Sequence, residues 1–157
     1  MVINRNLGNY DLMSTYTDKN GRSVIVINPS VMNKVTFSYF NEAFLHEMIH
    51  AVTVDIINNP VTAEDFAFVK KNHEMWAKLR GLYKEDDPAL LDVESGLYAL
   101  QNEKEFAAVF ATDATAREFF FKLAERADAN KNRGFLQKMK NFIISFIKAF
   151  SKKASFE

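Results

Sequence analysis

The chain has 157 residues, of which 48% are hydrophobic and 13% aromatic, enough apolar material to fold around a core. Its 20 basic and 20 acidic residues cancel, so the overall charge gives no reason to expect nucleic-acid binding. Cysteine is absent, which excludes disulfides, thiol catalysis and zinc held by cysteine. The sequence shows no apolar signal region and no apolar run long enough to span a membrane, so we expect a soluble protein without its own export signal.

The first thirty residues predict a β-hairpin. Residues 10–17 and 22–28 have the composition of strands, and Asp-Lys-Asn-Gly at 18–21 is typical of a tight turn between them. Residues 23–27 form the strongest predicted strand, which ends at Asn28 and Pro29. Residues 24–27 could pair at a sheet edge with an extended peptide, although an ordinary core strand explains the same pattern.

The rest of the chain predicts helices, bounded by caps, prolines and polar loops. The expected helices cover residues 36–57, 62–82, 102 to about 112, from there to about 127, and 135–152. A charged loop at 84–88 follows the second of them, and a polar linker at 128–134 precedes the last. We therefore expect an α+β fold, with residues 1–127 as one domain and residues 128–157 as a linker and a helix docked on it.

The most informative motif is His-Glu-x-x-His at residues 46–50, inside the first predicted helix. Residues four apart lie on one helix face, so the imidazoles of His46 and His50 can converge on one metal ion. Glu47 then lies beside the open coordination position, where a carboxylate can take a proton from water. Ordinary core or surface histidines can have the same spacing, so a third ligand has to decide between the two interpretations.

Glu105 is the candidate third ligand, because zinc bound by two histidines often takes a carboxylate as well. It lies three residues after Asn102, however, and can equally be a first-turn residue beside a helix cap. Glu103 is a second carboxylate within reach. Spacing alone leaves these alternatives open.

The two segments together resemble the gluzincin metallopeptidases. The second segment reads Tyr-x6-Glu-Phe-x-Ala from Tyr98 to Ala108. This pattern after His-Glu-x-x-His is similar to the anthrax lethal factor protease domain and to gluzincin-like domains of phage polyvalent proteins. Ile-Asn-Pro at 27–29 also matches the end of the hairpin in the phage domains.

The resemblance implies a small zincin-like fold and a zinc metalloendopeptidase acting on a peptide or protein substrate. It implies that His46, His50 and Glu105 bind one Zn²⁺, that Glu47 is the general base, and that Tyr98 stabilises the oxyanion or the leaving group. It also implies a phage-associated protein, either cytoplasmic or carried in the virion.

One position departs from the family pattern. Val109 stands where the family commonly has a second glutamate, which orients a histidine ligand. Losing such a partner typically costs about 10- to 100-fold in metal affinity or activity. Asp113, Asp55 or a backbone carbonyl could supply another acceptor. An alternative interpretation is therefore a weak or inactive zincin that binds metal or peptide without turnover.

The last predicted helix is basic and amphipathic. Apolar residues recur at helical spacing from Phe135 to Phe150, and seven basic residues but one acid lie between Lys131 and the end. Such a helix can lie on a membrane surface, but we expect it to pack on its own domain or a partner. A further alternative is a phage or mobile-element structural module that acts through this helix. We expect His73 on a helix surface and Trp76 in the core.

Overall fold

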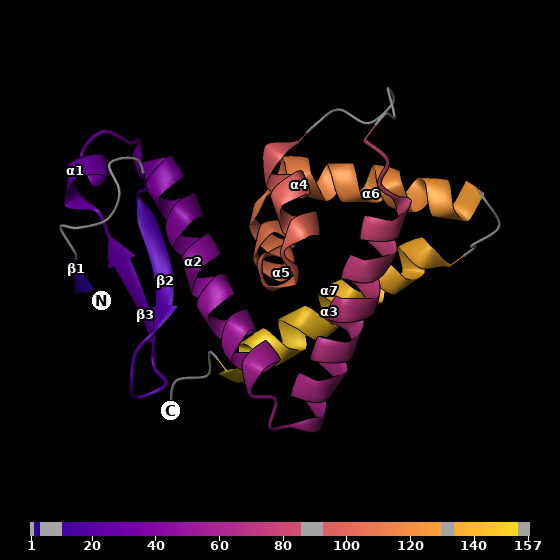
Figure 1. The fold of residues 1–157 in the computed structure, drawn as a ribbon, viewed down its shortest axis with the longest axis horizontal. Coiled ribbons are helices and arrows are strands. Elements are labelled where there is room, and N and C mark those ends of the chain that lie inside the picture. Colours follow the sequence, from indigo (N-terminus) through magenta and orange to yellow (C-terminus); the bar gives the residue numbers. More distant parts are fainter. Residues whose placement is uncertain (1, 4–10, 86–92, 130–133, 154–157) are drawn as a thin grey trace.

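The computed structural model describes residues 2–3, 11–85, 93–129 and 134–153. The predicted α+β class is confirmed: a small N-terminal sheet is followed by a mostly helical remainder. Helix α2 (Phe37–Asn58) lies between the sheet on one side and the other long helices on the other (Figure 1). This central helix carries the His-Glu-x-x-His motif.

The predicted hairpin is present. Strands β2 (Met13–Thr17) and β3 (Ser23–Ile27) pair antiparallel, and the turn between them contains Gly21 at φ 78°. The left-handed region suits glycine, which has no Cβ to clash there. Strand β1 (Val2–Ile3) pairs parallel with β3, so the sheet order is β1-β3-β2. Strand β2 therefore lies at one edge of the sheet, whereas Val26 and Ile27 pair with strands on both sides. Pairing of residues 24–27 with an extended peptide stays a prediction.

All five predicted helices are present, and two short ones were not predicted. The helices are α1 (Pro29–Met32), α2, α3 (Ala63–Leu82), α4 (Glu94–Gln101), α5 (Glu103–Thr112), α6 (Ala114–Ala129) and α7 (Phe135–Lys153). The expected linker begins later than 128, because α6 continues to Ala129, and residues 130–133 lie outside the described residues. Residues 86–88 of the expected loop at 84–88 also lie outside the described residues. No helix in the described part of the chain is long and apolar enough to cross a membrane.

Side-chain caps explain where the long helices begin. The Thr36 hydroxyl accepts from the backbone N–H of Tyr39 at the start of α2. At the start of α3, Thr62 and Asp65 each accept from the other's backbone N–H, which is a capping box. The Asn102 side chain accepts from the N–H of Lys104 at the start of α5. Each cap satisfies a backbone donor that the first helical turn leaves unpaired.

Two hydrophobic cores hold α2 from opposite sides. The smaller core joins it to the hairpin through Leu12, Met13 and Ile27, with Phe40 and Phe44 packed against them. The larger core lies among α2 to α7 and contains a group of stacked and tilted rings, with centroids 5.2 to 6.0 Å apart, from Phe106, Phe110, Phe120 and Phe142. Helix α7 joins this core through the buried Phe135, Met139 and Phe142. Packing on both sides fixes the middle of α2 relative to α5.

Candidate metal centre

Glu105 faces α2 because the residues that follow it are buried. Residues 106–110 of α5 are all at most 4% exposed, so the rotation of this helix about its axis is fixed by core packing. Glu105 is the third residue of α5, but its carboxylate does not complete a capping box. The backbone N–H of Asn102 donates instead to the carbonyl of Tyr98. The carboxylate is therefore free to meet the histidines of α2.

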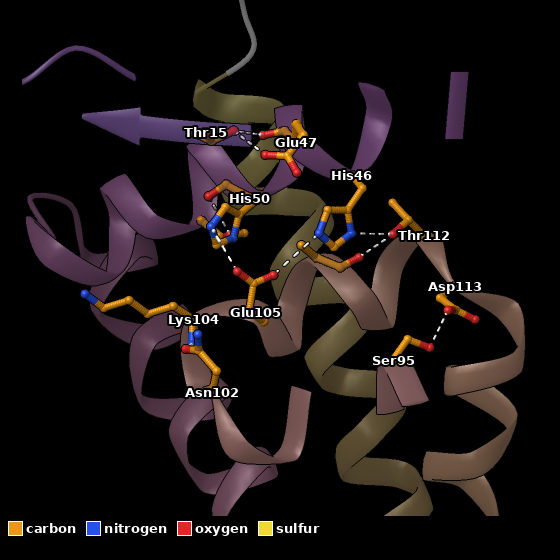
Figure 2. Close-up of polar contacts among 12 residues, drawn as sticks. Thr15, His46, Glu47, His50, Ser95, Asn102, Lys104, Glu105, Thr112 and Asp113 are labelled. Atoms are coloured by element: carbon orange, nitrogen blue, oxygen red, sulfur yellow. Dashed lines mark hydrogen bonds and ion pairs between the residues drawn. The ribbon is translucent and has the colours of Figure 1, made fainter. Parts of the chain in front are cut away.

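The structure brings His46, His50 and Glu105 together. Nε2 of His46 lies 3.5 Å from Oε2 of Glu105, and Nε2 of His50 lies 3.3 Å from Oε1. The two rings are nearly parallel, with an interplanar angle of 15°. Figure 2 shows both rings pointing from α2 towards the carboxylate on α5. All three side chains are largely shielded from solvent, since their exposed fractions are 26%, 16% and 14%.

The carboxylate remains ionised in this position. Burial by itself raises the pKa of Glu105, but its hydrogen bond with His46 and its electrostatic interactions with His50 and His46 outweigh burial and lower the pKa below its usual value. The pocket between α2 and α5 therefore combines a carboxylate with two imidazole nitrogens.

The two distances between histidine and carboxylate are compatible with a shared cation. Two ligands bound to zinc at about 2.0–2.1 Å with a tetrahedral angle lie about 3.3 Å apart, close to the two observed separations. In the described part of the chain, however, no three His, Asp or Glu side chains are already arranged as a metal site. The carboxylate of Glu105 spans the two rings with a different oxygen on each. The side chains therefore have to rearrange before one oxygen can lie close to both nitrogens.

The hydroxyl of Thr112 lies next to the ring of His46. Its hydroxyl donates to the backbone carbonyl of Ala108 at 2.7 Å and lies 3.1 Å from Nδ1 of His46. Because a carbonyl can only accept, the single hydroxyl proton is used there, and Nδ1 must be the donor to Thr112. Nε2, which faces Glu105, is then the nitrogen that can take up a further proton or bind a metal ion. Sequence reasoning named Asp113 and Asp55 as acceptors and missed Thr112.

His50 has no such partner. Its Nδ1 is buried and has no hydrogen-bond partner among the described residues. Val109, at the position where the gluzincin pattern has a second glutamate, is 4% exposed and offers no acceptor. Asp113 is engaged elsewhere, because its carboxylate accepts from Ser95 and from the N–H of Ala116.

Glu47 points from α2 towards strand β2, and among the described residues no polar contact joins it to His46, His50 or Glu105. Its Oε2 accepts a 2.5 Å hydrogen bond from the hydroxyl of Thr15 on β2, as Figure 2 shows. Among the described residues, Oε1 has no partner. Tyr98 lies on α4 with 51% of its surface exposed, and no polar side-chain contact joins it to the three residues above in the described structure. The contact between Thr15 and Glu47 was not predicted from the sequence.

The competing carboxylate, Glu103, is paired with a different histidine. Both its oxygens lie 3.2 Å from Nδ1 of His73 on α3, at the surface of the molecule. Trp76 on the same helix is only partly buried and donates through Nε1 to the carbonyl of Ala99. Of the two acids at the start of α5, Glu105 is thus the one next to the motif.

A cavity of about 460 Å³ adjoins His46. Its walls come from the first half of α2, the start of α4 and the junction of α5 and α6. They include Tyr39, Glu42, Ser95, Val109, Thr112 and Asp113. Cavities that bind small molecules and side chains are of this size.

The chain matches no protein-family model, no curated protein and no solved structure. The likeness to gluzincins therefore rests on the sequence motifs, and the geometry of the site has to be judged on its own.

Proposed function

We propose that this chain is a zinc-dependent peptidase whose metal ligands are His46, His50 and Glu105. The observation that carries the proposal is the meeting of both Nε2 atoms with one carboxylate at 3.3 and 3.5 Å across two helices. The residues fit zinc chemically, since two neutral imidazoles and a carboxylate are a usual zinc-binding set. A proton on Nδ1 of His46 leaves the other nitrogen available to the metal.

Zinc in such a site supplies a Lewis acid that polarises a carbonyl and activates water near neutral pH. The protein's own contribution to proton transfer is Glu47. Its Oε1 takes a proton from the attacking water as the water oxygen adds to the peptide carbonyl carbon. The same oxygen then delivers that proton to the departing amine nitrogen when the C–N bond breaks. Thr15 holds the other oxygen, Oε2, and so orients the carboxylate.

Two further parts of the proposal concern the substrate. The outer strand β2 carries Thr15, so a peptide paired along this edge would pass beside Glu47. The cavity next to His46 gives room for a substrate side chain. Only the resemblance makes Tyr98 the candidate for stabilising the oxyanion, and its side chain is half exposed on α4.

The test is cleavage of a peptide library by the wild type and by Glu47→Gln. We expect the wild type to cleave peptides from the library. A chelator should abolish this activity, and added zinc should restore it. Glu47→Gln should bind zinc normally and lose about 10²- to 10⁴-fold in rate. The exposed Glu118→Gln on α6 is the matched control and should keep full activity. Zinc-independent cleavage, or an active Glu47→Gln, would contradict the proposal.

One alternative has an observation in its favour. The unpaired Nδ1 of His50 and the valine at position 109 are what a zincin that binds metal without turnover would show. Zinc binding by a wild type that cleaves nothing in the library would favour it. The interpretation based on the C-terminal helix gains no such support, because Phe135, Met139 and Phe142 of α7 are buried in the core.

A further inference from the structure

We propose that the Thr112 hydroxyl is the acceptor that fixes the proton position and ring orientation of His46. For zinc binding, this inference rests on the function proposed above. The hydrogen bond itself does not, and it can be measured without metal.

The number of protons on His46 and Thr112 decides which group donates. A histidine that binds metal through one nitrogen usually donates its other N–H to an acceptor, which fixes the tautomer and the ring plane. Nδ1 of His46 has one neighbour in this role, Oγ1 of Thr112 at 3.1 Å. That oxygen donates its only proton to the Ala108 carbonyl at 2.7 Å. It therefore faces His46 with its lone pairs.

Thr112 lies on the same face of α5 as Glu105. It lies seven residues after Glu105, which is almost two full turns, so both residues point towards α2. The buried side chains of Phe106 and Val109 between them hold that face in place. A hydroxyl about one turn beyond position 109 thus supplies an acceptor for the ring of His46.

A consequence is that the two histidines are not equivalent. His46 is held by an acceptor, whereas His50 has a buried Nδ1 with no partner among the described residues. A protonated Nδ1 in that position costs free energy, because a buried donor without an acceptor loses its hydrogen bonds to water. Orientation of the metal-binding pair therefore depends mainly on Thr112.

The experiment uses Thr112→Val, which keeps the shape and removes the hydroxyl, and Thr112→Ser, which keeps the hydroxyl. Long-range ¹H–¹⁵N NMR of the metal-free protein at about pH 8, where histidine is ordinarily neutral, reports whether Nδ1 of His46 carries a proton. Chelator competition gives the zinc dissociation constant. Thermal melting checks that each variant is folded, and Thr112→Ala replaces the valine variant if that one is not.

We expect a protonated Nδ1 in the wild type and in Thr112→Ser, and loss of that proton signal in Thr112→Val. The zinc dissociation constant should rise about 10- to 100-fold in Thr112→Val and stay near the wild-type value in Thr112→Ser. An unchanged Nδ1 signal and an unchanged zinc dissociation constant in Thr112→Val would overturn the inference. If the wild type binds no zinc but the Nδ1 signal still depends on the hydroxyl, the proposed function fails and the role of Thr112 stands.

Discussion

Thr15, on the outer strand of the sheet, donates a 2.5 Å hydrogen bond to the carboxylate of Glu47 on the central helix. The same hydroxyl lies 3.3 Å from the backbone carbonyl of Glu47. This contact ties the strand next to the site to the residue proposed as general base. It leaves Oε1 of Glu47 as the oxygen available for proton transfer.

Replacing Thr15 by valine should therefore affect turnover more than metal binding. Hydrogen bonds to charged groups contribute about 1.5–3 kcal/mol, so loss of the contact should lower kcat by about 10- to 100-fold. Zinc content should not change, because the hydrogen bonds of Thr15 go to Glu47 and not to a proposed ligand. Steady-state kinetics on a cleaved peptide checks this, with Thr15→Ser as the control that keeps the hydroxyl. A kcat equal to that of the wild type in Thr15→Val would show that Glu47 needs no such partner.

The close approach of α4 to α6 depends on a glycine. A Cβ added at Gly96 would lie 2.8 Å from Cδ1 of Phe119, whose ring is buried in the core and cannot move aside. Gly96→Ala should lower the free energy of unfolding by about 1–3 kcal/mol. A Cβ added at Gly81, in α3, would meet no neighbouring atom within 4 Å, so Gly81→Ala should raise stability by about 0.5–1 kcal/mol. Urea unfolding of both variants gives the comparison, and equal effects would contradict it.

Asp113 links α5 to α6 and should make stability depend on pH. Burial raises the pKa of its carboxyl, but hydrogen bonds from Ser95, Ala116 and Thr115 and the charge of Arg117 lower it overall. A lowered folded pKa means that the unfolded chain binds the proton more readily. The stabilisation is therefore present above the unfolded pKa of about 3.9 and is lost as pH falls through the folded value.

Asp113→Ala removes this helix cap and should cost about 0.5–2 kcal/mol at neutral pH. The difference in free energy of unfolding between wild type and variant should shrink as the pH falls below about 4. Asp113→Asn, which keeps a capping oxygen without the charge, should lose less than the alanine variant. Denaturant unfolding across the pH range measures all three, and a difference that grows in acid would contradict the assignment.

Local signals explain why most elements were predictable. The Asn-Gly turn marked the hairpin, and the threonine and asparagine caps marked the starts of α2, α3 and α5. Helix α4 lacked such a signal, because its first flanking residue is Val93, which makes no side-chain cap, and Gly96 weakens the helical pattern. The short β1 contributes two residues, too few to reveal from sequence that β3 is central.

The candidate ligands could be read from sequence, but their partners could not. The spacing of His46 and His50 follows from helix geometry, and the motif around Glu105 was recognisable. Thr112 offered one usable signal, since a polar residue seven positions after Glu105 lies on the same helix face. Thr15 offered none. Its contact with Glu47 joins residues 32 positions apart and exists only because the sheet packs on α2.

The most direct test of the central claim is the zinc content of the purified protein, measured by inductively coupled plasma mass spectrometry. Wild type, Glu105→Gln and Glu103→Gln should be compared, because the two acids are close in sequence but Glu103 is paired with His73. We predict about one zinc per chain in the wild type and in Glu103→Gln, and a sharp loss in Glu105→Gln. Full zinc in Glu105→Gln, or no zinc in the wild type even after reconstitution, would contradict the site built from His46, His50 and Glu105.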